Sequence, residues 1–186
     1  MAYRVRATAI AEVLILEPQV HRDARGLFYE SFNQSDFERA TGCALSFVQD
    51  NHSRSVRNVL RGLHYQLPRP QGKLVRVVCG EVYDVVVDLR RRATTFGQWA
   101  ATRLSAENFQ QLWVPPGFAH GFLTLSDVAE VIYKVTDAYA PEFERCLLWS
   151  DPALGIAWPL EDQPRLSAKD AQGERLADAL TYEAGF

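Results

Sequence analysis

The stretch "NVLRGLHYQLPRPQGKLVRVVCGEVYDVVVDLR", residues 58–90, decides the fold prediction. Arg, His, Gln and Lys residues stand within a few positions around His64, and two Val-rich runs follow, separated by Gly80. Such dense β-branched residues favour strands over helices. The segment therefore predicts two consecutive strands, preceded by a polar cluster whose purpose has to be explained.

The rest of the chain repeats this pattern, with short runs rich in Val, Ile, Phe, Tyr and Trp between Pro and Gly residues. Many short strands joined by turns are expected. The predicted strands are 13–16, 28–32, 47–53, 59–64, 73–79, 81–88, 97–104, 111–114, 120–124, 130–135 and 146–149.

Helical signals are few. "SDFERATG" begins with Ser35, has Glu38 three residues later as in a capping box, and ends at Gly42, a suitable C-cap. A second helix is expected near the C-terminus, weakened by Gly173. The sequence thus predicts one all-β domain over residues 1–186, a sandwich or jelly-roll barrel with one or two small peripheral helices. Residues from about 167 to 186 form its peripheral helix or tail.

Composition excludes several classes of protein. The chain has 186 residues, 47% apolar and 23% charged, which is typical of one globular domain. Its net charge of −3 argues against a general nucleic-acid binder. The three Cys residues form no CxxC pair, which predicts free thiols in a reducing compartment. No signal peptide and no run of ~18 apolar residues is present. We expect a cytoplasmic protein that does not interact with membranes.

The stretch "EVIYKVTD", residues 130–137, predicts where one tyrosine points. Alternation places Tyr133 on one face with Val131 and Val135, and Lys134 on the other. Because Lys134 prefers solvent, Tyr133 is expected to point inward. It is either a core tyrosine with a backbone partner or a general acid facing a cavity.

The stretch "PPGFAHGF", which contains His120, resembles the second signature of the cupin superfamily, where this His often binds a metal. In the first cupin signature, a second His and a Glu supply further ligands. Counted from His64 and Gly80, those positions here hold Gln66 and Lys73. A mononuclear metal needs three or four protein ligands, and an ammonium repels a cation. A barrel without a metal is expected, and a metal-dependent cupin enzyme is the alternative.

A metal-free site of this kind can still move protons. His64 can act as a base near neutral pH, Lys73 can stabilise charge on oxygen, and Tyr133 can return a proton from another wall. This set suits proton abstraction next to a carbonyl, as in an epimerase that needs no cofactor. The simpler interpretation is that His64 only fills space beside a strand, with Arg61 and Lys73 on the surface.

The motifs together resemble the dTDP-4-dehydrorhamnose 3,5-epimerase family from about Val13 to Asp170. The matching segments are "RDARGLFYESFN", "FVQDNHSRS", "NVLRGLHYQ", "QGKLVRVVCGEVYDVVVDLR", "TFGQW", "LSAENFQQLWVPPGFAHGF", "VIYKVTDAYAPE", "WSDPALGIAWP" and "LSAKD". The resemblance implies a jelly-roll cupin that forms a homodimer with exchanged strands. It also implies epimerisation at C3 and C5 of dTDP-4-dehydro-6-deoxy-D-glucose, giving dTDP-4-dehydro-L-rhamnose for L-rhamnose biosynthesis.

The same resemblance assigns residues to roles. His64 is implied as the base, Asp170 as its dyad partner, Tyr133 as the acid and Lys73 as the lysine near the ketone oxygen. Contacts to the nucleotide sugar are implied for Arg25, Glu30, Gln49, Asn51, Arg61, His120, Tyr139, Glu144 and Lys169. For Asp170 the residues alone favour another interpretation, because Ser167 and Asp170 are spaced as a capping box.

The chain also departs from the family pattern. His21 stands where the family usually has Phe, and Tyr139 where some members have Trp; both changes bear on nucleotide affinity rather than on the base or acid. Two further alternatives stay open: an epimerase that inverts only C3 or C5, and a non-catalytic sensor of dTDP-sugars. A sensor has no need to keep the base, acid and lysine together.

Overall fold

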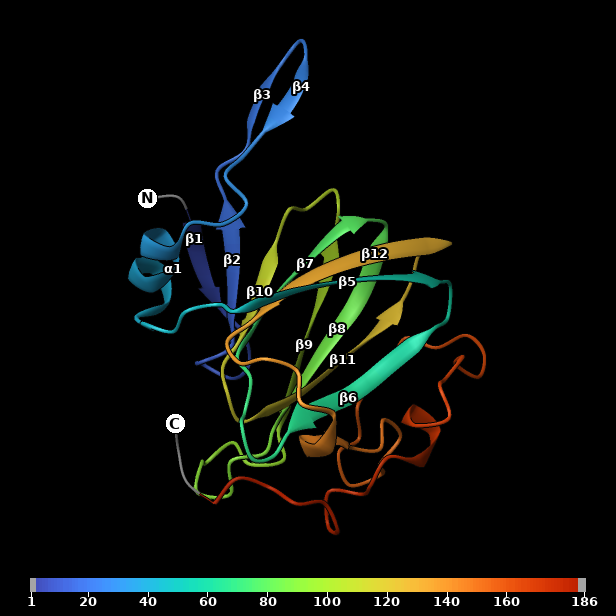
Figure 1. Cartoon of the computed structure of the whole chain (residues 1–186). Coiled ribbons are helices and arrows are strands. Elements are labelled where there is room, and N and C mark those ends of the chain that lie inside the picture. Colours follow the sequence, from blue (N-terminus) through green and yellow to red (C-terminus); the bar gives the residue numbers. More distant parts are fainter. Residues whose placement is uncertain (1–2, 184–186) are drawn as a thin grey trace.

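The computed structural model describes residues 3–183 as two antiparallel sheets packed face to face (Figure 1). The first sheet has the strand order β1 (Tyr3–Ala7), β2 (Leu14–Pro18), β10 (Gln111–Val114), β7 (Lys73–Cys79), β12 (Val128–Val135), β5 (Gln49–Val56). The second has the order β13 (Glu144–Cys146), β6 (Leu60–Gln66), β11 (Phe118–Thr124), β8 (Glu81–Asp88), β9 (Trp99–Ser105). This arrangement confirms the predicted cupin-type jelly roll.

The main core lies between the sheets. Val75 and Val77 of β7 meet Val82 and Val86 of β8 there, together with Val131 of β12. Each strand contributes alternate residues to this core, as the pleat requires.

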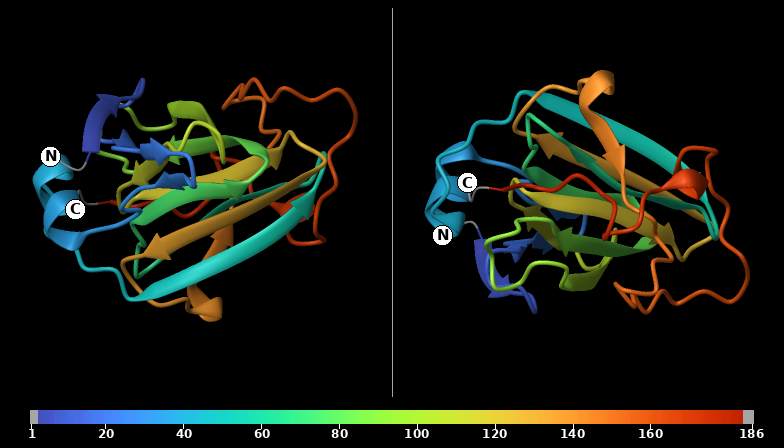
Figure 2. Two further views of the ribbon diagram at one scale, coloured as in Figure 1. Left: turned by 90° about the horizontal axis from the view of Figure 1, so that it is seen from above. Right: turned by 90° about the horizontal axis from the view of Figure 1, so that it is seen from below.

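Strand β8 is buried on both faces. Its second face, including Val85 and Val87, packs against Leu147, Leu154 and Tyr182 of the C-terminal segment. Figure 2 shows this segment, coloured orange to red, passing across the outside of the barrel. This packing explains the continuous Val-rich run of β8, because a strand that is buried on both faces carries apolar residues on both faces.

The predicted N-terminal helix is present as α1 (Gln34–Thr41). It begins two residues earlier than expected, because Asn33 rather than Ser35 is the N-cap and accepts a hydrogen bond from the backbone N–H of Asp36. Gly42 ends the helix in the left-handed conformation, as predicted. The helix buries Phe37 edge-on against the ring of Trp113, with centroids 4.9 Å apart.

The predicted C-terminal helix is wrong for residues 167–183, where the structure has one short 3₁₀ turn, η2 (Asp170–Gln172); residues 184–186 lie outside the described chain. Glu174 instead exchanges backbone hydrogen bonds with residues 146 and 148, at 2.9 and 2.7 Å. A Cβ on Gly173 would come within 2.7 Å of the Leu148 backbone nitrogen. Backbone pairing with a distant strand therefore outweighs the helix propensity here.

Several strand predictions also need correction. β1 and β3 (His21–Asp23) were missed, and the expected strand 146–149 lies earlier as β13. The expected strand 28–32 is wrong apart from Phe28, the last residue of β4 (Gly26–Phe28). β4 pairs with β3 (His21–Asp23) in a hairpin that projects away from both sheets (Figure 1). A short turn, η1 (Pro141–Phe143), precedes β13. In residues 3–183, helices are all too short for a bilayer, the longest being the eight residues of α1.

Candidate active site

A cavity of about 330 Å³ opens between the two sheets. Strands β5 and β12 form one wall, and β6 and β11 form the opposite wall. Nine predicted site residues line it: Gln49, Asn51, Arg61, His64, Lys73, His120, Tyr133, Tyr139 and Glu144. Residues that the sequence did not single out also line it, among them Ser53, Gln66 and Phe122.

Two glycines allow β6 and β11 to approach closely beneath the cavity. His64 pairs with His120 across these strands, and the register shifts just after His120. A Cβ on Gly121 would lie 2.5 Å from the Arg61 carbonyl oxygen, and one on Gly62 would lie 2.7 Å from the His120 carbonyl oxygen. Only glycine fits this crossing, which brings both histidines to the same wall.

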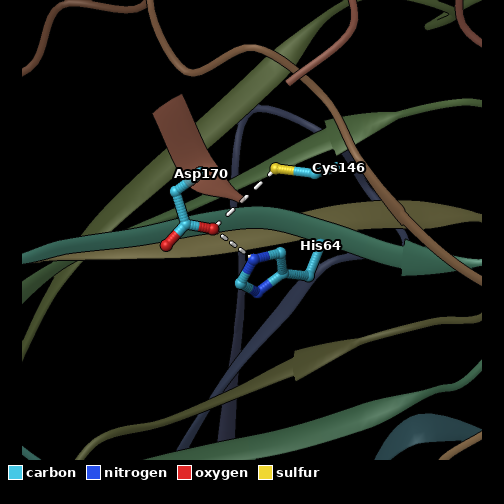
Figure 3. A group of neighbouring side chains, drawn as sticks. All are labelled: His64, Cys146 and Asp170. Carbon is cyan, nitrogen blue, oxygen red and sulfur yellow. Dashed lines mark hydrogen bonds and ion pairs between the residues drawn. The ribbon is translucent and has the colours of Figure 1, made fainter. Parts of the chain in front are cut away.

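The His64 imidazole forms a hydrogen-bonded dyad with Asp170 (Figure 3). His64 Nε2 lies 2.5 Å from Asp170 Oδ1, and Asp170 is 3% exposed. Burial alone raises the pKa of a carboxyl group, but the hydrogen bonds from His64 and Ser167 outweigh it and hold the Asp170 pKa below its ordinary value. An ionised Asp170 fixes the proton on Nε2 and leaves Nδ1 as the nitrogen that can accept one.

Asp170 also makes the contacts expected of the local turn. Its backbone N–H donates to Ser167 Oγ at 3.1 Å, and the Ser167 hydroxyl donates to Asp170 Oδ2 at 2.8 Å. One half of the expected capping box is present, but no helix begins at Ser167, and Lys169 is the N-cap of η2. The Ser167 hydroxyl instead helps to aim the carboxylate that the imidazole contacts.

Tyr133 enters the cavity from β12, in the sheet opposite to that of His64. Its neighbours Val131 and Val135 are buried in the core, as the alternation predicted. Burial raises the pKa of the Tyr133 hydroxyl, and nearby Arg61 offsets only part of this rise. The phenol therefore carries its proton at neutral pH and can donate it.

Lys73 is a buried cation at the cavity. Its Nζ donates to the backbone carbonyl of His64 at 3.1 Å, and the residue is 6% exposed. Burial lowers the pKa of Lys73 to about 8, against the opposing influence of Asp84 and Glu144. A positive charge thus stands at the position where a cupin metal site has a carboxylate.

Asp84 is a site residue that sequence reasoning missed. It is fully buried in β8, and its two carboxylate oxygens lie 2.9 and 3.0 Å from His120 Nε2. The available signal was a lone Asp inside a valine run, because a buried carboxylate requires a partner. His120 is therefore oriented by Asp84 in the way that His64 is oriented by Asp170.

The cavity rim carries a second polar network. Glu144 accepts a hydrogen bond from the Tyr139 hydroxyl at 2.8 Å and pairs with Lys169 Nζ at 2.6 Å. Gln49 joins this network, because its Oε1 accepts from the Tyr139 backbone N–H at 2.9 Å, and its Nε2 donates to Asn51 Oδ1 at 2.8 Å. These groups offer both hydrogen-bond donors and acceptors to a polar ligand.

Arg25 and Glu30 are not at this cavity, whereas six other predicted contacts line it and Lys169 pairs with the lining residue Glu144. Arg25 and Glu30 are exposed, and the Arg25 side chain, 90% accessible, pairs with Asp23 at 2.6 Å near the hairpin tip. Within one chain the projecting β3–β4 hairpin holds Arg25 away from the barrel (Figure 1). His21 lies in the same hairpin, exposed.

Comparison with known proteins identifies the family. The family model described as dTDP-4-dehydrorhamnose 3,5-epimerase matches residues 7–178. The chain belongs to the dTDP-4-dehydrorhamnose 3,5-epimerase family. The enzyme of that name from Pseudomonas aeruginosa is 62% identical over 171 residues, which cover 92% of this chain and 94% of that protein.

Solved structures of epimerases have the same fold. The structure of dTDP-6-deoxy-D-glucose-3,5-epimerase from Legionella pneumophila, in complex with dTDP-4-keto-L-rhamnose, superposes with a TM-score of 0.96 at 48% identity, covering 99% of this chain and all of that one. A 3'-monoepimerase from Streptomyces bikiniensis, in complex with dTDP-quinovose, has a TM-score of 0.87 at 36% identity, covering 92% and 87%. A fold this similar is therefore also found in an enzyme named as a monoepimerase.

Proposed function

We propose that this epimerase inverts C3 and C5 of dTDP-4-dehydro-6-deoxy-D-glucose, a step of L-rhamnose biosynthesis, by proton transfer between His64 and Tyr133. One observation carries the mechanism: an imidazole with an ionised partner and a protonated phenol enter one cavity from opposite sheets. A sugar ring held between the two walls exposes one face to each group. The 62% identity to a curated 3,5-epimerase supports the double reaction.

The chemistry at each carbon is a proton exchange. His64 Nδ1 takes the proton from the carbon next to the C4 ketone, and the electron pair of the broken C–H bond moves onto the ketone oxygen as an enolate. The Lys73 ammonium stabilises this negative charge. Tyr133 then donates its proton to the opposite face of the carbon, which inverts it, and exchange with water restores both groups. The substrate ketone stores the charge, so the mechanism needs no cofactor.

Substrate binding in this proposal uses the rim and a second chain. The nucleotide sugar is contacted by Gln49, Asn51, Arg61, His120, Tyr139, Glu144 and Lys169. Arg61 is suited to phosphate, because its guanidinium presents forked hydrogen-bond donors. Arg25 and Glu30 reach the cavity of a partner subunit in a homodimer that exchanges the β3–β4 hairpin. Leu27 and Phe28, 45% and 72% exposed in the hairpin, support this, because such apolar groups are buried in stable interfaces.

Single-carbon epimerisation is the competing function. The similarity to a 3'-monoepimerase supports this alternative, because the two proteins share a fold with a TM-score of 0.87. Which carbons react depends on how the ring sits between His64 and Tyr133, and not only on which residues are present.

Deuterium exchange tests the proposal directly. The 4-keto sugar nucleotide is incubated with enzyme in heavy water, and the product is trapped with an NADPH-dependent reductase and analysed by NMR. We expect deuterium at both C3 and C5, with exchange at least ~100-fold slower in His64→Asn and in Tyr133→Phe. Label at C3 alone establishes the single-carbon reaction.

The matched control is His52→Asn. His52 is an exposed histidine on β5 that pairs with Glu130 at 3.0 Å, away from the cavity lining. Its exchange rate should equal that of the unsubstituted enzyme. Undiminished exchange in His64→Asn removes His64 from the mechanism.

A further inference from the structure

Three side chains that can each ligate a metal, one of them the proposed base His64, lie close together (Figure 3). A ring nitrogen of His64, the Sγ of Cys146 and a carboxylate oxygen of Asp170 lie within 4.8 Å of one another. We propose that these residues form an inhibitory site for a thiophilic divalent cation, Zn²⁺ or Cd²⁺. The cation is an inhibitor here and not a cofactor, because it occupies the dyad on which the proposed proton transfer depends.

The fold brings these donors together from distant parts of the chain. Cys146 of β13 is paired directly with His64 of β6, and Asp170 comes from η2. His64 Nε2 lies 2.5 Å and Cys146 Sγ 3.9 Å from Asp170 Oδ1. Ligand atoms of a tetrahedral zinc site stand about 3.4–3.6 Å apart, so His64 and Asp170 have to separate by about 1 Å.

The donor set selects the class of cation. Imidazole, thiolate and carboxylate are the ligands that Zn²⁺ takes, whereas Mg²⁺ and Ca²⁺ prefer oxygen alone. Three protein ligands leave a fourth position for water, as in zinc sites that are open to a cavity. Cys146 is partly buried. Binding of the cation releases the thiol proton, and the proton on His64 Nε2 moves to Nδ1 so that Nε2 can ligate.

The surrounding charges are compatible with a cation. Asp170 is ionised, and the nearby Lys169 is already neutralised by Glu144 at 2.6 Å. Lys73 donates to the backbone carbonyl of His64, on the cavity side, and its positive charge is offset by Asp84. Gln66 and Lys73, which stand at the cupin ligand positions, are not part of this site.

Cadmium is the probe for the test, because a Cd²⁺–thiolate bond absorbs in the near ultraviolet. The full chain is titrated with Cd²⁺ while absorbance, bound cadmium by equilibrium dialysis, and turnover are followed. We expect a thiolate band that rises together with loss of turnover. In Cys146→Ser the band should disappear and the affinity should fall at least about tenfold.

Cys79→Ser is the matched control, since it removes an exposed thiol on β7. It should keep the band and the inhibition. Equal cadmium affinity and inhibition in Cys146→Ser and the unsubstituted chain would overturn the proposal, as would a band that survives this substitution. The absorbance and dialysis do not depend on turnover, so a wrong substrate assignment would not be mistaken for failure of the metal site.

Discussion

Lys73 is the residue whose chemistry depends most on where the fold places it. Free lysine is protonated at any physiological pH, but here burial at the cavity lowers the pKa to about 8. The ammonium has lost most of its water and donates to one backbone carbonyl, that of His64. The attraction between a developing enolate and the Lys73 ammonium is therefore stronger than it would be for a lysine exposed to water, because the buried surroundings screen charge poorly.

The lowered pKa predicts a basic limb in the pH profile. Lys73 is charged below about 8 and neutral above it, so kcat/KM should fall as pH rises through about 8. Because kcat/KM reports groups of the free enzyme, the limb should appear near that value. Lys73→Arg stays protonated, so the variant, although slower, should lose this limb. Initial rates between pH 6 and 10 check it, and an unchanged limb in Lys73→Arg would assign it to another group.

At the residue scale, the inward direction of Tyr133 could be predicted, because alternation determines which face a side chain takes. His64 was singled out by its position relative to the cupin signature, and the structure places it at the cavity. Asp84 could not be paired with His120 in advance, because the pairing depends on the register between β8 and β11. Arg25 and Glu30 lie away from the cavity of their own chain, which residue type and motif position did not indicate.

At the scale of elements, the β6–β11 crossing sets the geometry of the site. Gly62 has a φ of +117°, which a side chain rarely permits, and Gly121 faces the Arg61 carbonyl with no room for a Cβ. The close approach places His64 and His120 side by side on one wall. Any side chain at the crossing pushes the strands apart and moves both imidazoles.

Gly121→Ala should therefore reduce both stability and turnover. Its Cβ meets backbone, which cannot rotate away, so we expect a loss of about 1–3 kcal/mol in the free energy of unfolding and a marked fall in kcat. Urea denaturation and the coupled assay measure the two effects. Gly155→Ala is the control: its Cβ meets nothing nearer than 4.0 Å, and its φ of +59° costs about 1–2 kcal/mol. That control should keep full turnover; unchanged stability in Gly121→Ala would contradict the steric argument.

Elements rich in strand-forming residues could be predicted, and those held by distant backbone could not. β7, β8 and β10 appear with the expected bounds, because β-branched and aromatic residues favour strands whether one face or both faces are buried. The C-terminal segment has helix-forming residues, yet Glu174 pairs with residues 146 and 148. Helix propensity is worth less than 1 kcal/mol per residue, so such tertiary hydrogen bonds override it.

For the whole molecule, the C-terminal segment connects stability with the site. The Tyr182 hydroxyl donates a hydrogen bond to the Gln66 backbone carbonyl at 2.5 Å. The backbone of Tyr182 also forms a parallel β-bridge with Arg90. The same segment supplies Asp170, which reaches His64 across 106 positions of sequence. Wrapping the barrel from outside thus holds a carboxylate behind the base, while the cavity side of the imidazole stays open to substrate.

The β3–β4 hairpin raises the question of whether one chain makes a complete site. Arg25 lies on the hairpin, away from the cavity that contains His64. In the proposed homodimer the two residues serve the same cavity from different chains. A C₂ dimer would then hold two equivalent sites, each with a base from one chain and an arginine from the other.

Mixing two defective variants tests this arrangement. Arg25→Ala should bind substrate poorly, and His64→Asn should not turn it over. If Arg25 acts on the partner, a mixed dimer has one cavity with the intact base and an intact arginine from the other chain. Random re-association then gives active sites in about a quarter of all cavities, so the mixture exceeds either parent at low substrate. If Arg25 serves its own chain, every cavity in the mixed dimer lacks one group, and the mixture only averages its parents.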